Sequence, residues 1–196
     1  MIKRAFDIST SLIALILLSP LIFVVSILII TDSKGGAFFH QIRVGRNGRE
    51  FKLHKFRTMR PAAESGGQLT VGMRDSRITK IGYTLRRYRL DELPQLWNIL
   101  VGEMSVVGPR PEVPKYVAMY SPEQRKVLNV RPGLTDYASI KYVNENEVLE
   151  KSSDPEKTYI QEIMPEKLEL NLKYIEKQSL ITDIKILLDT VKAIFS

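Results

Sequence analysis

Asp91 and Glu92 are adjacent carboxylates that come shortly after three arginines, Arg86, Arg87 and Arg89. A carboxylate near several guanidinium groups stays ionised, and it can act as a nucleophile or as a metal ligand. Arginine side chains can hold a diphosphate through paired hydrogen bonds. The cluster therefore indicates a site for a phosphorylated ligand, although an isolated Asp-Glu-x-Pro sequence is more often a simple helix cap.

A further arginine is flanked by prolines in the segment Gly108-Pro109-Arg110-Pro111. Because proline fixes the backbone angle φ, this segment would preorganise the guanidinium of Arg110 for a phosphate. Taken alone, the segment is more simply a rigid surface turn. Lys55 and Arg57 add two cations at the end of a predicted strand, where such charges are usually only solvated.

The chain has 196 residues, no cysteine and two histidines. Disulfides, thiolate chemistry and cysteine-based zinc sites are therefore excluded. A metal would have to bind through carboxylates and phosphates, which are the ligands of Mg²⁺ and similar hard cations.

Positive charge is concentrated in one block of this chain, whose formal net charge is +7. Residues 40–120 carry 15 lysines and arginines against 7 aspartates and glutamates, whereas residues 121–196 carry 11 against 13. Anionic headgroups or phosphorylated ligands are natural partners of such a block. Nucleic acid is the rival interpretation, but the basic residues are scattered among apolar ones and no nucleic-acid motif appears, so we expect no nucleic-acid partner.

The elements that must position these residues begin with an apolar segment of 24 residues between Asp7 and Asp32. As a helix it would be about 36 Å long, enough to cross a ~30 Å hydrocarbon core. Ser19-Pro20 lies near its middle, where proline removes a helical hydrogen bond and bends the helix. The Ser19 hydroxyl could compensate by bonding to the carbonyl of Leu15 or Ile16.

Basic residues flank both ends of this segment, and positive charge favours the cytoplasmic side of a membrane. We therefore predict a re-entrant membrane helix over residues 1–34, broken at Ser19 and Pro20, and one soluble domain over residues 35–196. A straight spanning helix with a tolerated proline is the alternative. A cleaved signal peptide fits less well, because the apolar run is too long and no cleavage site follows it.

The residue patterns of the soluble part predict an α+β fold that is mostly helical and contains a short β-hairpin. Asn47-Gly48 favours a tight turn, because both residues accept positive φ angles, so strands are expected over 37–44 and 50–56. Other expected elements are a loop over 61–76, helices over 79–87 and about 93–102, an irregular stiff loop over 106–114, a capping motif over 121–124, and helices from Pro155 with a new one opening at Pro165. The last helix has an apolar face made of Ile184, Leu187, Leu188, Val191 and Phe195. Such a face usually packs in the core, and a membrane-surface role is the secondary alternative.

Together these motifs resemble the small, single-domain form of the monotopic phosphoglycosyl transferases, the bacterial sugar transferase family. The matching blocks are the Ser19-Pro20 anchor, the hairpin FFHQIRVGRNGREFKLHKFRTM and the stretch DSRITKIGYTLRRYRLDELPQLWNILVGEMSVVGPRPE. They cover residues 1–112 in order and at the family's spacing, and the ordered set is far more specific than any one block.

The resemblance implies an enzyme that moves a sugar 1-phosphate from a UDP-sugar to a polyprenyl phosphate, expected to be undecaprenyl phosphate, and releases UMP. It would act at the cytoplasmic face of the bacterial inner membrane, in the first membrane step of an O-antigen, capsule, exopolysaccharide or glycoprotein glycan. Asp91 matches the nucleophile that forms a covalent aspartyl-phosphosugar intermediate, and Glu92 matches its partner, with Mg²⁺ bound at this pair. The expected substrate-binding and phosphate-binding residues are Arg86, Arg87, Gln95, Arg110, Lys55 and Arg57.

The chain departs from the commonest family pattern at Asp136 and Ser139, which replace residues that the resemblance places at the sugar nucleotide. The sequence therefore does not identify the sugar. The alternative from another functional class is a membrane-bound adaptor of a polysaccharide assembly complex without activity. A homo-oligomer is compatible with either function.

Overall fold

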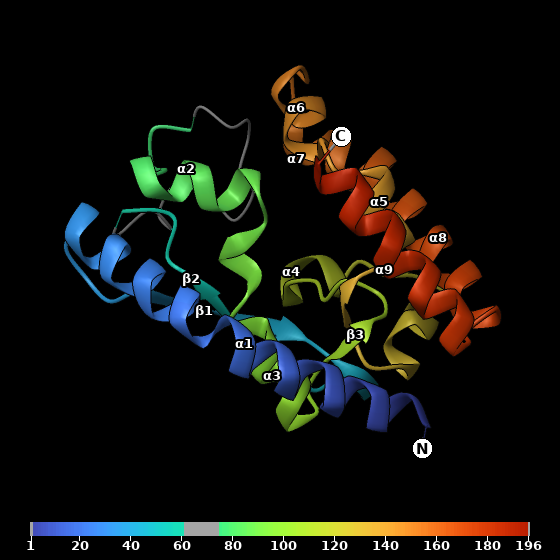
Figure 1. Ribbon diagram of the computed structural model, residues 1–196. Coiled ribbons are helices and arrows are strands. Elements are labelled where there is room, and N and C mark those ends of the chain that lie inside the picture. Colours follow the sequence, from blue (N-terminus) through green and yellow to red (C-terminus); the bar gives the residue numbers. More distant parts are fainter. Residues whose placement is uncertain (1, 61–74, 196) are drawn as a thin grey trace.

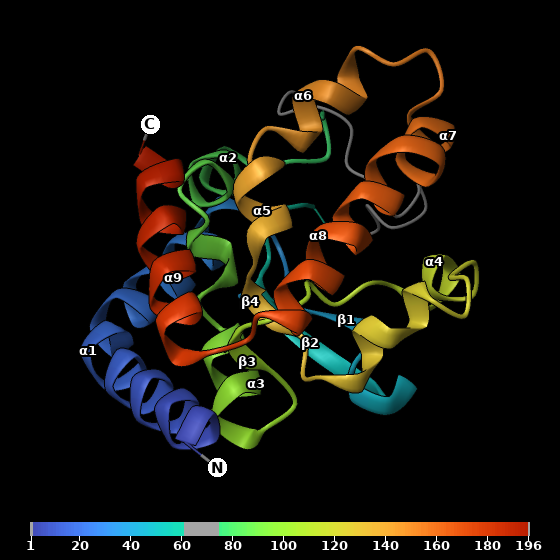
Figure 2. The same ribbon diagram turned by 90° about the vertical axis from the view of Figure 1, so that its right-hand side faces the viewer.

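The computed structural model describes residues 2–60 and 75–195, and the predicted loop over 61–76 falls mostly outside them. Helices dominate, and two small sheets of two strands each lie among them (Figures 1 and 2). The α-helices are α1 (Ile2–Asp32), α2 (Lys80–Arg87), α3 (Gln95–Val101), α4 (Pro114–Val117), α5 (Tyr137–Lys141), α6 (Glu145–Glu150), α7 (Pro155–Thr158), α8 (Met164–Glu176) and α9 (Leu180–Phe195). The strands are β1 (Phe38–Val44), β2 (Glu50–Phe56), β3 (Ser105–Val107) and β4 (Gly133–Thr135).

The N-terminal helix α1 remains helical through Pro20. The hydroxyl of Ser19 donates a hydrogen bond to the carbonyl of Ile16 at 2.8 Å, as predicted from the sequence. In the part of the chain that the structure describes, α1 is the one helix long and apolar enough to cross a membrane. Only 11% of its most apolar window is buried against the protein, so most of its apolar surface is open.

The first turns of α1 are attached to the rest of the protein by polar contacts. Lys3 Nζ donates to the carbonyl of Val107 at 2.9 Å. The buried Asp7 carboxylate accepts hydrogen bonds from Ser105 Oγ at 2.9 Å and from Val106 N at 3.0 Å. A buried carboxylate is stable only when it is paired in this way. These contacts explain why an aspartate stands directly before the apolar segment.

The last turn of α1 is attached to the same domain. Arg57, at the end of β2, donates from Nε to the carbonyl of Gly36 at 2.6 Å and from its other two nitrogens to the hydroxyl and carbonyl of Ser33. Asp32 accepts a hydrogen bond from Ile81 N at 3.2 Å, at the start of α2. Both ends of α1 are therefore held by one folded unit.

The predicted β-hairpin is confirmed, with β1 and β2 antiparallel and Phe38 opposite Phe56. Its turn places Asn47 at φ 59° and Gly48 at φ 73°, the positive angles expected of this pair. After β2 the chain passes so close to α2 that a Cβ on Gly82 would lie 2.1 Å from the carbonyl oxygen of Thr58. This contact requires glycine and fixes α2 against the end of the hairpin.

The loop predicted over 106–114 is irregular only in part, because Val106 and Val107 belong to β3, which pairs in parallel with β4. Directly after this pair, Gly108 and Gly133 lie in contact, and a Cβ on Gly133 would lie 2.1 Å from the nitrogen of Gly108. The capping motif at Ser121 is confirmed, since its hydroxyl and backbone exchange hydrogen bonds with Gln124. That cap begins a 3₁₀ segment rather than an α-helix.

The C-terminal helices lie on the side of the molecule opposite α2 (Figure 1), where α9 packs against α5, β3 and β4. Pro165 lies in the first turn of α8, but α7 runs into α8 through a π-helical segment, Tyr159–Ile163, so no new helix starts at the proline. On α9, Ile186 is fully buried, whereas Leu188 is 59% exposed. The predicted apolar face therefore does not pack in the core, with Ile184, Leu188 and Val191 exposed and Leu187 partly buried; the side chain of Phe195 lies outside the described residues.

Candidate active site

The two adjacent carboxylates lie on a buried 3₁₀ turn, Leu90–Glu92, between α2 and α3. Arg89 precedes the turn with left-handed backbone angles, φ 56° and ψ 18°. Asp91 and Glu92 are each 7% exposed. They do not cap α3, because that helix begins only at Gln95 and no side chain caps it. The helix-cap interpretation of the pair is therefore wrong, and their burial needs another explanation.

Glu92 is surrounded by cations. Arg110 donates to both of its carboxylate oxygens, from Nη1 to Oε2 at 3.1 Å and from Nη2 to Oε1. Lys55 Nζ lies 3.5 Å and Arg89 Nη1 lies 3.8 Å from Oε1. Burial alone would raise the pKa of Glu92, but Arg110 and Lys55 outweigh burial and hold that pKa well below its usual range. Glu92 is an ionised carboxylate whose charge is already compensated.

Asp91 has a different environment from its neighbour. Its carboxylate accepts no hydrogen bond from any residue that the structure describes. Burial, and then the charge of Glu92, raise the pKa of Asp91 against the opposing effect of Lys55 and Arg86. The nearby cations therefore do not outweigh burial in setting the pKa of Asp91, contrary to what the neighbouring arginines in the sequence suggested. Arg110 thus holds Glu92 and compensates its charge, whereas Asp91 is buried beside it with oxygens that accept no hydrogen bond from the described residues.

Lys55 and Arg86 reach this pair from two elements. Lys55 comes from β2, where burial lowers the pKa of its ammonium to about 8 despite the opposing charge of Glu92. Arg86 comes from α2, and its Nε donates to Thr58 Oγ1 at 2.8 Å. Its two terminal nitrogens donate to none of the described residues. They are available to bind an anion next to Asp91.

Three other predicted residues lie differently. Arg57 uses all three of its nitrogens to hold the segment after α1, and Arg87 is exposed with its guanidinium 5.7 Å from the centre of the Tyr88 ring. The structure does not bring these two to the carboxylate pair. Gln95 is 1% exposed at the start of α3, and its Nε2 has no hydrogen-bond partner among the described residues. An unpaired buried amide so near the carboxylates is what a binding residue would show without its ligand.

The loop that carries Arg110 is held by a residue whose role the sequence did not reveal. Asp136 is fully buried, and its carboxylate accepts from Arg110 N at 3.0 Å and from Ser139 N at 2.6 Å. The contact of Gly108 with Gly133 holds the same loop from the other side. Asp136 therefore positions Arg110 and begins α5, and its departure from the family pattern was the one signal in the sequence that could have found it.

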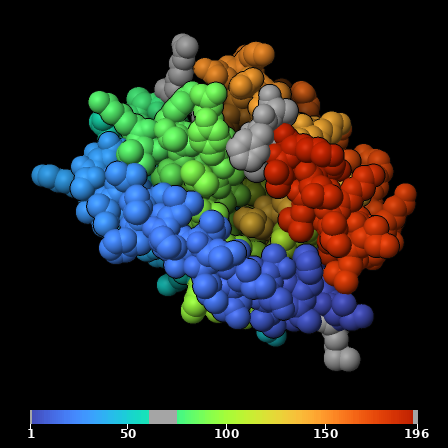
Figure 3. All heavy atoms as spheres, viewed as in Figure 1, coloured from blue at the N-terminus to red at the C-terminus, as the bar shows by residue number. Residues whose placement is uncertain are grey.

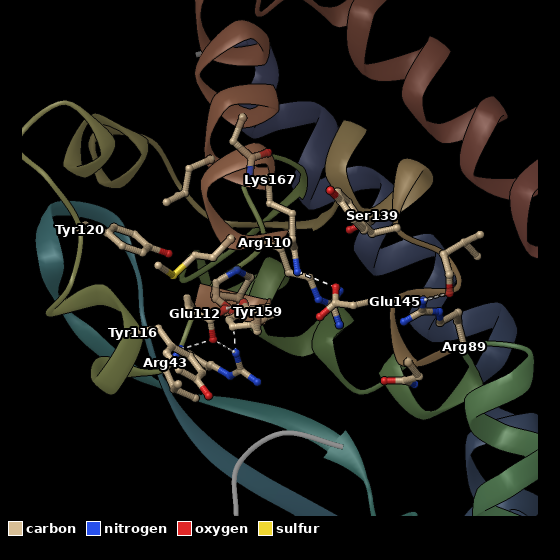
Figure 4. A pocket seen from close by; sticks show the side chains of 18 residues that line it. Arg43, Arg89, Arg110, Glu112, Tyr116, Tyr120, Ser139, Glu145, Tyr159 and Lys167 are labelled. Atoms are coloured by element: carbon tan, nitrogen blue, oxygen red, sulfur yellow. Dashed lines mark hydrogen bonds and ion pairs between the residues drawn. The ribbon is translucent and has the colours of Figure 1, made fainter. Parts of the chain in front are cut away.

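A cavity of about 190 Å³ lies between α8 and the segment that carries Arg110 (Figure 4). Arg89 and Arg110, the two arginines that contact Glu92, form part of its wall. On the opposite side, α8 contributes Lys167, whose ammonium forms an ion pair with Glu145 at 2.8 Å. In the space-filling view a hollow opens between the segment around α2, drawn in green, and α9, drawn in red, with α1 along its lower rim (Figure 3).

The donor set fits Mg²⁺ only with help from a substrate. No cluster of three metal-binding side chains occurs among residues 2–60 and 75–195. Mg²⁺ commonly binds one or two carboxylates together with substrate phosphates and water. The free oxygens of Asp91 suit such a site, whereas those of Glu92 already accept from Arg110.

The whole chain, residues 1–196, matches the family described as bacterial sugar transferase. The UDP-N-acetylgalactosamine-undecaprenyl-phosphate N-acetylgalactosaminephosphotransferase of Aeromonas hydrophila is 36% identical over 198 residues, covering 100% of this chain and 44% of the relative. The UDP-glucose:undecaprenyl-phosphate glucose-1-phosphate transferase of Escherichia coli is 34% identical over 199 residues, covering 97% of this chain and 39% of the relative.

This chain thus spans less than half the length of those two relatives. It spans 87% of a Bacillus subtilis protein named as the uncharacterized sugar transferase EpsL, which is 34% identical over 193 residues. The match over the whole chain confirms the resemblance drawn from the sequence motifs. The chain therefore belongs to the bacterial sugar transferase family, and its buried carboxylate pair and apolar N-terminal helix agree with this.

Proposed function

We propose that this chain transfers a sugar 1-phosphate from a UDP-sugar to undecaprenyl phosphate and releases UMP. The observation that carries the proposal is the buried pair in which Glu92 is compensated by cations and Asp91 is free. The names of the relatives supply the class of lipid acceptor and of sugar donor. Those names differ in the sugar, N-acetylgalactosamine in one and glucose in another, so they do not assign the donor.

Two displacements at one phosphorus atom account for the reaction. In the first, an oxygen of Asp91 bonds to the sugar-linked phosphorus, the bond from that phosphorus to the bridging oxygen breaks, and UMP leaves with the electron pair. In the second, an oxygen of undecaprenyl phosphate bonds to the same phosphorus and the bond to Asp91 breaks. Neither step requires a proton transfer, because nucleophiles and leaving groups are all anions.

The cations around the pair make these steps possible. Every reactant is an anion, so Arg86 and Lys55 would lower the repulsion between the diphosphate and the carboxylates. Glu92 would act as a positioning residue that holds Arg110 and Lys55 where the phosphates bind. Asp91 would hold Mg²⁺, which would supply positive charge to offset the negative charge of the phosphates.

We further propose that α1 is a re-entrant anchor with both ends on the cytoplasmic side of the inner membrane. The contacts of Lys3 and Asp7 at one end, and of Ser33 at the other, support this topology. A helix that spans a bilayer cannot have both of its ends bound to one domain on one side. This anchor would keep the active site at the depth where the phosphate of a lipid acceptor lies.

Replacing Asp91 tests the covalent mechanism. With the correct UDP-sugar and Mg²⁺ but no lipid, the wild type should release UMP in a burst of at most one per active site. Intact-protein mass spectrometry should show a sugar-phosphate adduct that undecaprenyl phosphate removes. Asp91→Asn should give neither burst nor adduct, because the amide is a poor nucleophile, whereas Asp189→Asn on α9 should behave as the wild type.

Other results would contradict parts of this proposal. UMP that appears only when both substrates are present would indicate a single direct displacement. A wild type that releases no UMP from any UDP-sugar, with or without lipid, would favour an adaptor without activity.

A further inference from the structure

The cavity beside the carboxylate pair contains polar atoms that the reaction steps above do not use. Asn171, on α8, is 4% exposed, and its Oδ1 has no hydrogen-bond partner in the described structure. Ser139, on α5, likewise has a buried hydroxyl without a partner there. Both residues belong to the wall of the cavity. Buried polar atoms are nearly always paired in folded proteins, so two unpaired ones in one cavity point to a missing ligand.

The position of the cavity says which part of a substrate could enter it. Arg89 and Arg110 line the cavity (Figure 4), and both also form ion pairs with Glu92. A group in the cavity would therefore lie next to a phosphate bound at the carboxylate pair. With about 190 Å³, the cavity is smaller than the ~300–1,000 Å³ typical of pockets for drug-sized ligands. It can hold one ring of a sugar nucleotide but not the whole molecule.

The chemistry of the wall favours a ring with hydroxyl groups. A hydroxyl can donate to the Oδ1 of Asn171 and can also accept from the hydroxyl of Ser139. The ion pair between Lys167 and Glu145 adds a donor and an acceptor to the same wall. Four tyrosines, Tyr116, Tyr120, Tyr142 and Tyr159, supply apolar surface for the faces of a ring.

We infer that this cavity binds the sugar ring of the donor, with Asn171 and Ser139 as residues that determine which sugar is accepted. The inference rests on the proposed function and makes it more specific. The sugar stays on the enzyme through both displacements, whereas UMP must leave between them. A walled cavity suits the sugar, which stays bound while UMP leaves.

The experiment compares Asn171→Leu and Ser139→Ala with the wild type. Leucine has the shape of asparagine without its polar atoms. UMP release would be measured with UDP-glucose, UDP-galactose, UDP-N-acetylglucosamine and UDP-N-acetylgalactosamine, and inhibition by free UMP would be measured in parallel. Each variant should lower kcat/KM for the preferred donor by about tenfold, as expected for the loss of one buried hydrogen bond to the substrate. The preference between donors should shrink, and inhibition by UMP should stay unchanged.

Folding is checked in the same proteins. Asn171→Leu should keep or raise the melting temperature, since it removes an amide oxygen that has no partner. Asn98→Leu is the matched control, because the side chain of Asn98 makes three hydrogen bonds, so this change should lower the melting temperature. If Asn171→Leu does not fold, Ser139→Ala decides the question alone.

The outcomes separate the inference from the proposed function. Unchanged donor preference in a folded variant would overturn the inference. Weaker inhibition by UMP, in proportion to the loss of kcat/KM, would also overturn it and would place the uridine in the cavity. Failure of the proposed function would appear instead in the wild type, as no UMP release from any donor.

Discussion

At the scale of single residues, the central feature is the contact of Arg110 with Glu92. The sequence predicted that Arg110 binds a substrate phosphate, and the structure places its guanidinium at the carboxylate pair. The structure adds a resident partner, because Glu92 already receives two hydrogen bonds from this guanidinium. The attraction of Glu92 raises the pKa of Arg110, so this guanidinium remains charged throughout the working pH range. Arg110 therefore balances the charge of the carboxylate pair, and we propose that it also contacts a bound phosphate.

Arg110→Ala should reduce kcat/KM by about 10- to 100-fold, through the loss of a phosphate contact. It should also reduce the free energy of unfolding by about 1–3 kcal/mol, because Glu92 then keeps only Lys55 and Arg89. The double variant Arg110→Ala, Glu92→Gln should recover stability without recovering activity, since it removes the uncompensated charge. Chemical denaturation and steady-state kinetics on both variants test this prediction. Wild-type kinetics in Arg110→Ala would exclude Arg110 from the site.

Lys55 should make activity sensitive to pH. Its pKa of about 8 means that the free enzyme loses this positive charge as pH rises through 8, so kcat/KM should fall there. Lys55→Arg should remove that decline, because a guanidinium stays protonated. Lys52→Arg, on the same strand, is the control and should keep the wild-type profile. A decline that persists in Lys55→Arg would have to come from another group.

The same group has an opposite effect on stability. Its pKa in the folded protein lies below the ordinary value of 10.5, so its charged form is disfavoured on folding. Burial of the charged ammonium therefore lowers the free energy of unfolding by its full amount below pH 8, and this loss of stability disappears as pH rises from about 8 to 10.5. Over that interval, Lys55 should contribute increasing stability relative to Lys55→Arg while activity falls.

At the scale of elements, α1 shows how a proline can be kept inside a membrane helix. The hydroxyl of Ser19 binds the carbonyl of Ile16, which would otherwise lack its helical partner. Polar contacts at both ends attach the helix to one domain. The break that the sequence suggested is thus a compensated proline site within one continuous helix.

The topology of α1 can be tested with single cysteines at positions 2 and 34, because the chain has no cysteine of its own. An impermeant thiol reagent applied to intact cells should label neither position, and both should react after the cells are opened. Labelling of position 2 alone from outside would establish a spanning helix. Replacing Ser19 and Pro20 by Ala and Leu should move part of the population to that spanning state.

At the scale of the whole molecule, α1 and α9 both expose apolar side chains. Lys3 near the start of α1 pairs with Asp183 near the start of α9, so the first turns of the two helices meet. On α9, Ile181 and Leu188 are 82% and 59% exposed. Exposed apolar surface that adjoins a membrane anchor is expected to lie at the same bilayer.

Ile184→Lys with Leu188→Lys should therefore weaken the step that uses the lipid. In membranes, the apparent KM for undecaprenyl phosphate should rise severalfold, because the active site no longer lies at the correct depth. The UMP burst without lipid should stay unchanged. Met119→Lys changes an equally exposed apolar residue elsewhere and should have no effect on either step. A reduced burst in the α9 variant would indicate damage to the active site instead.

Local patterns in the sequence were sufficient to find the candidate carboxylate pair and the simplest elements. Asp91 and Glu92 with the preceding arginines, the turn at Asn47-Gly48 and the apolar N-terminal helix were all readable, because each depends on residues close together in the chain. The same patterns failed where distant segments meet. Val106 and Val107 became a strand only because β4 lies beside them. Leu188 is exposed because α9 turns a different face, with Asp183 and Ile186, towards the protein.

The tertiary structure alone decided how the site is completed. Arg110 meets Glu92, Asp136 holds the loop of Arg110, and Asn171 of α8 comes to the same cavity. Spacing along the chain carries no information on these pairings, since each depends on how whole helices pack. The sequence by itself thus determined which chemistry is present, because reactivity belongs to residue types. The fold determined which carboxylate is compensated and which is free, because charge balance depends on neighbours that only packing brings together.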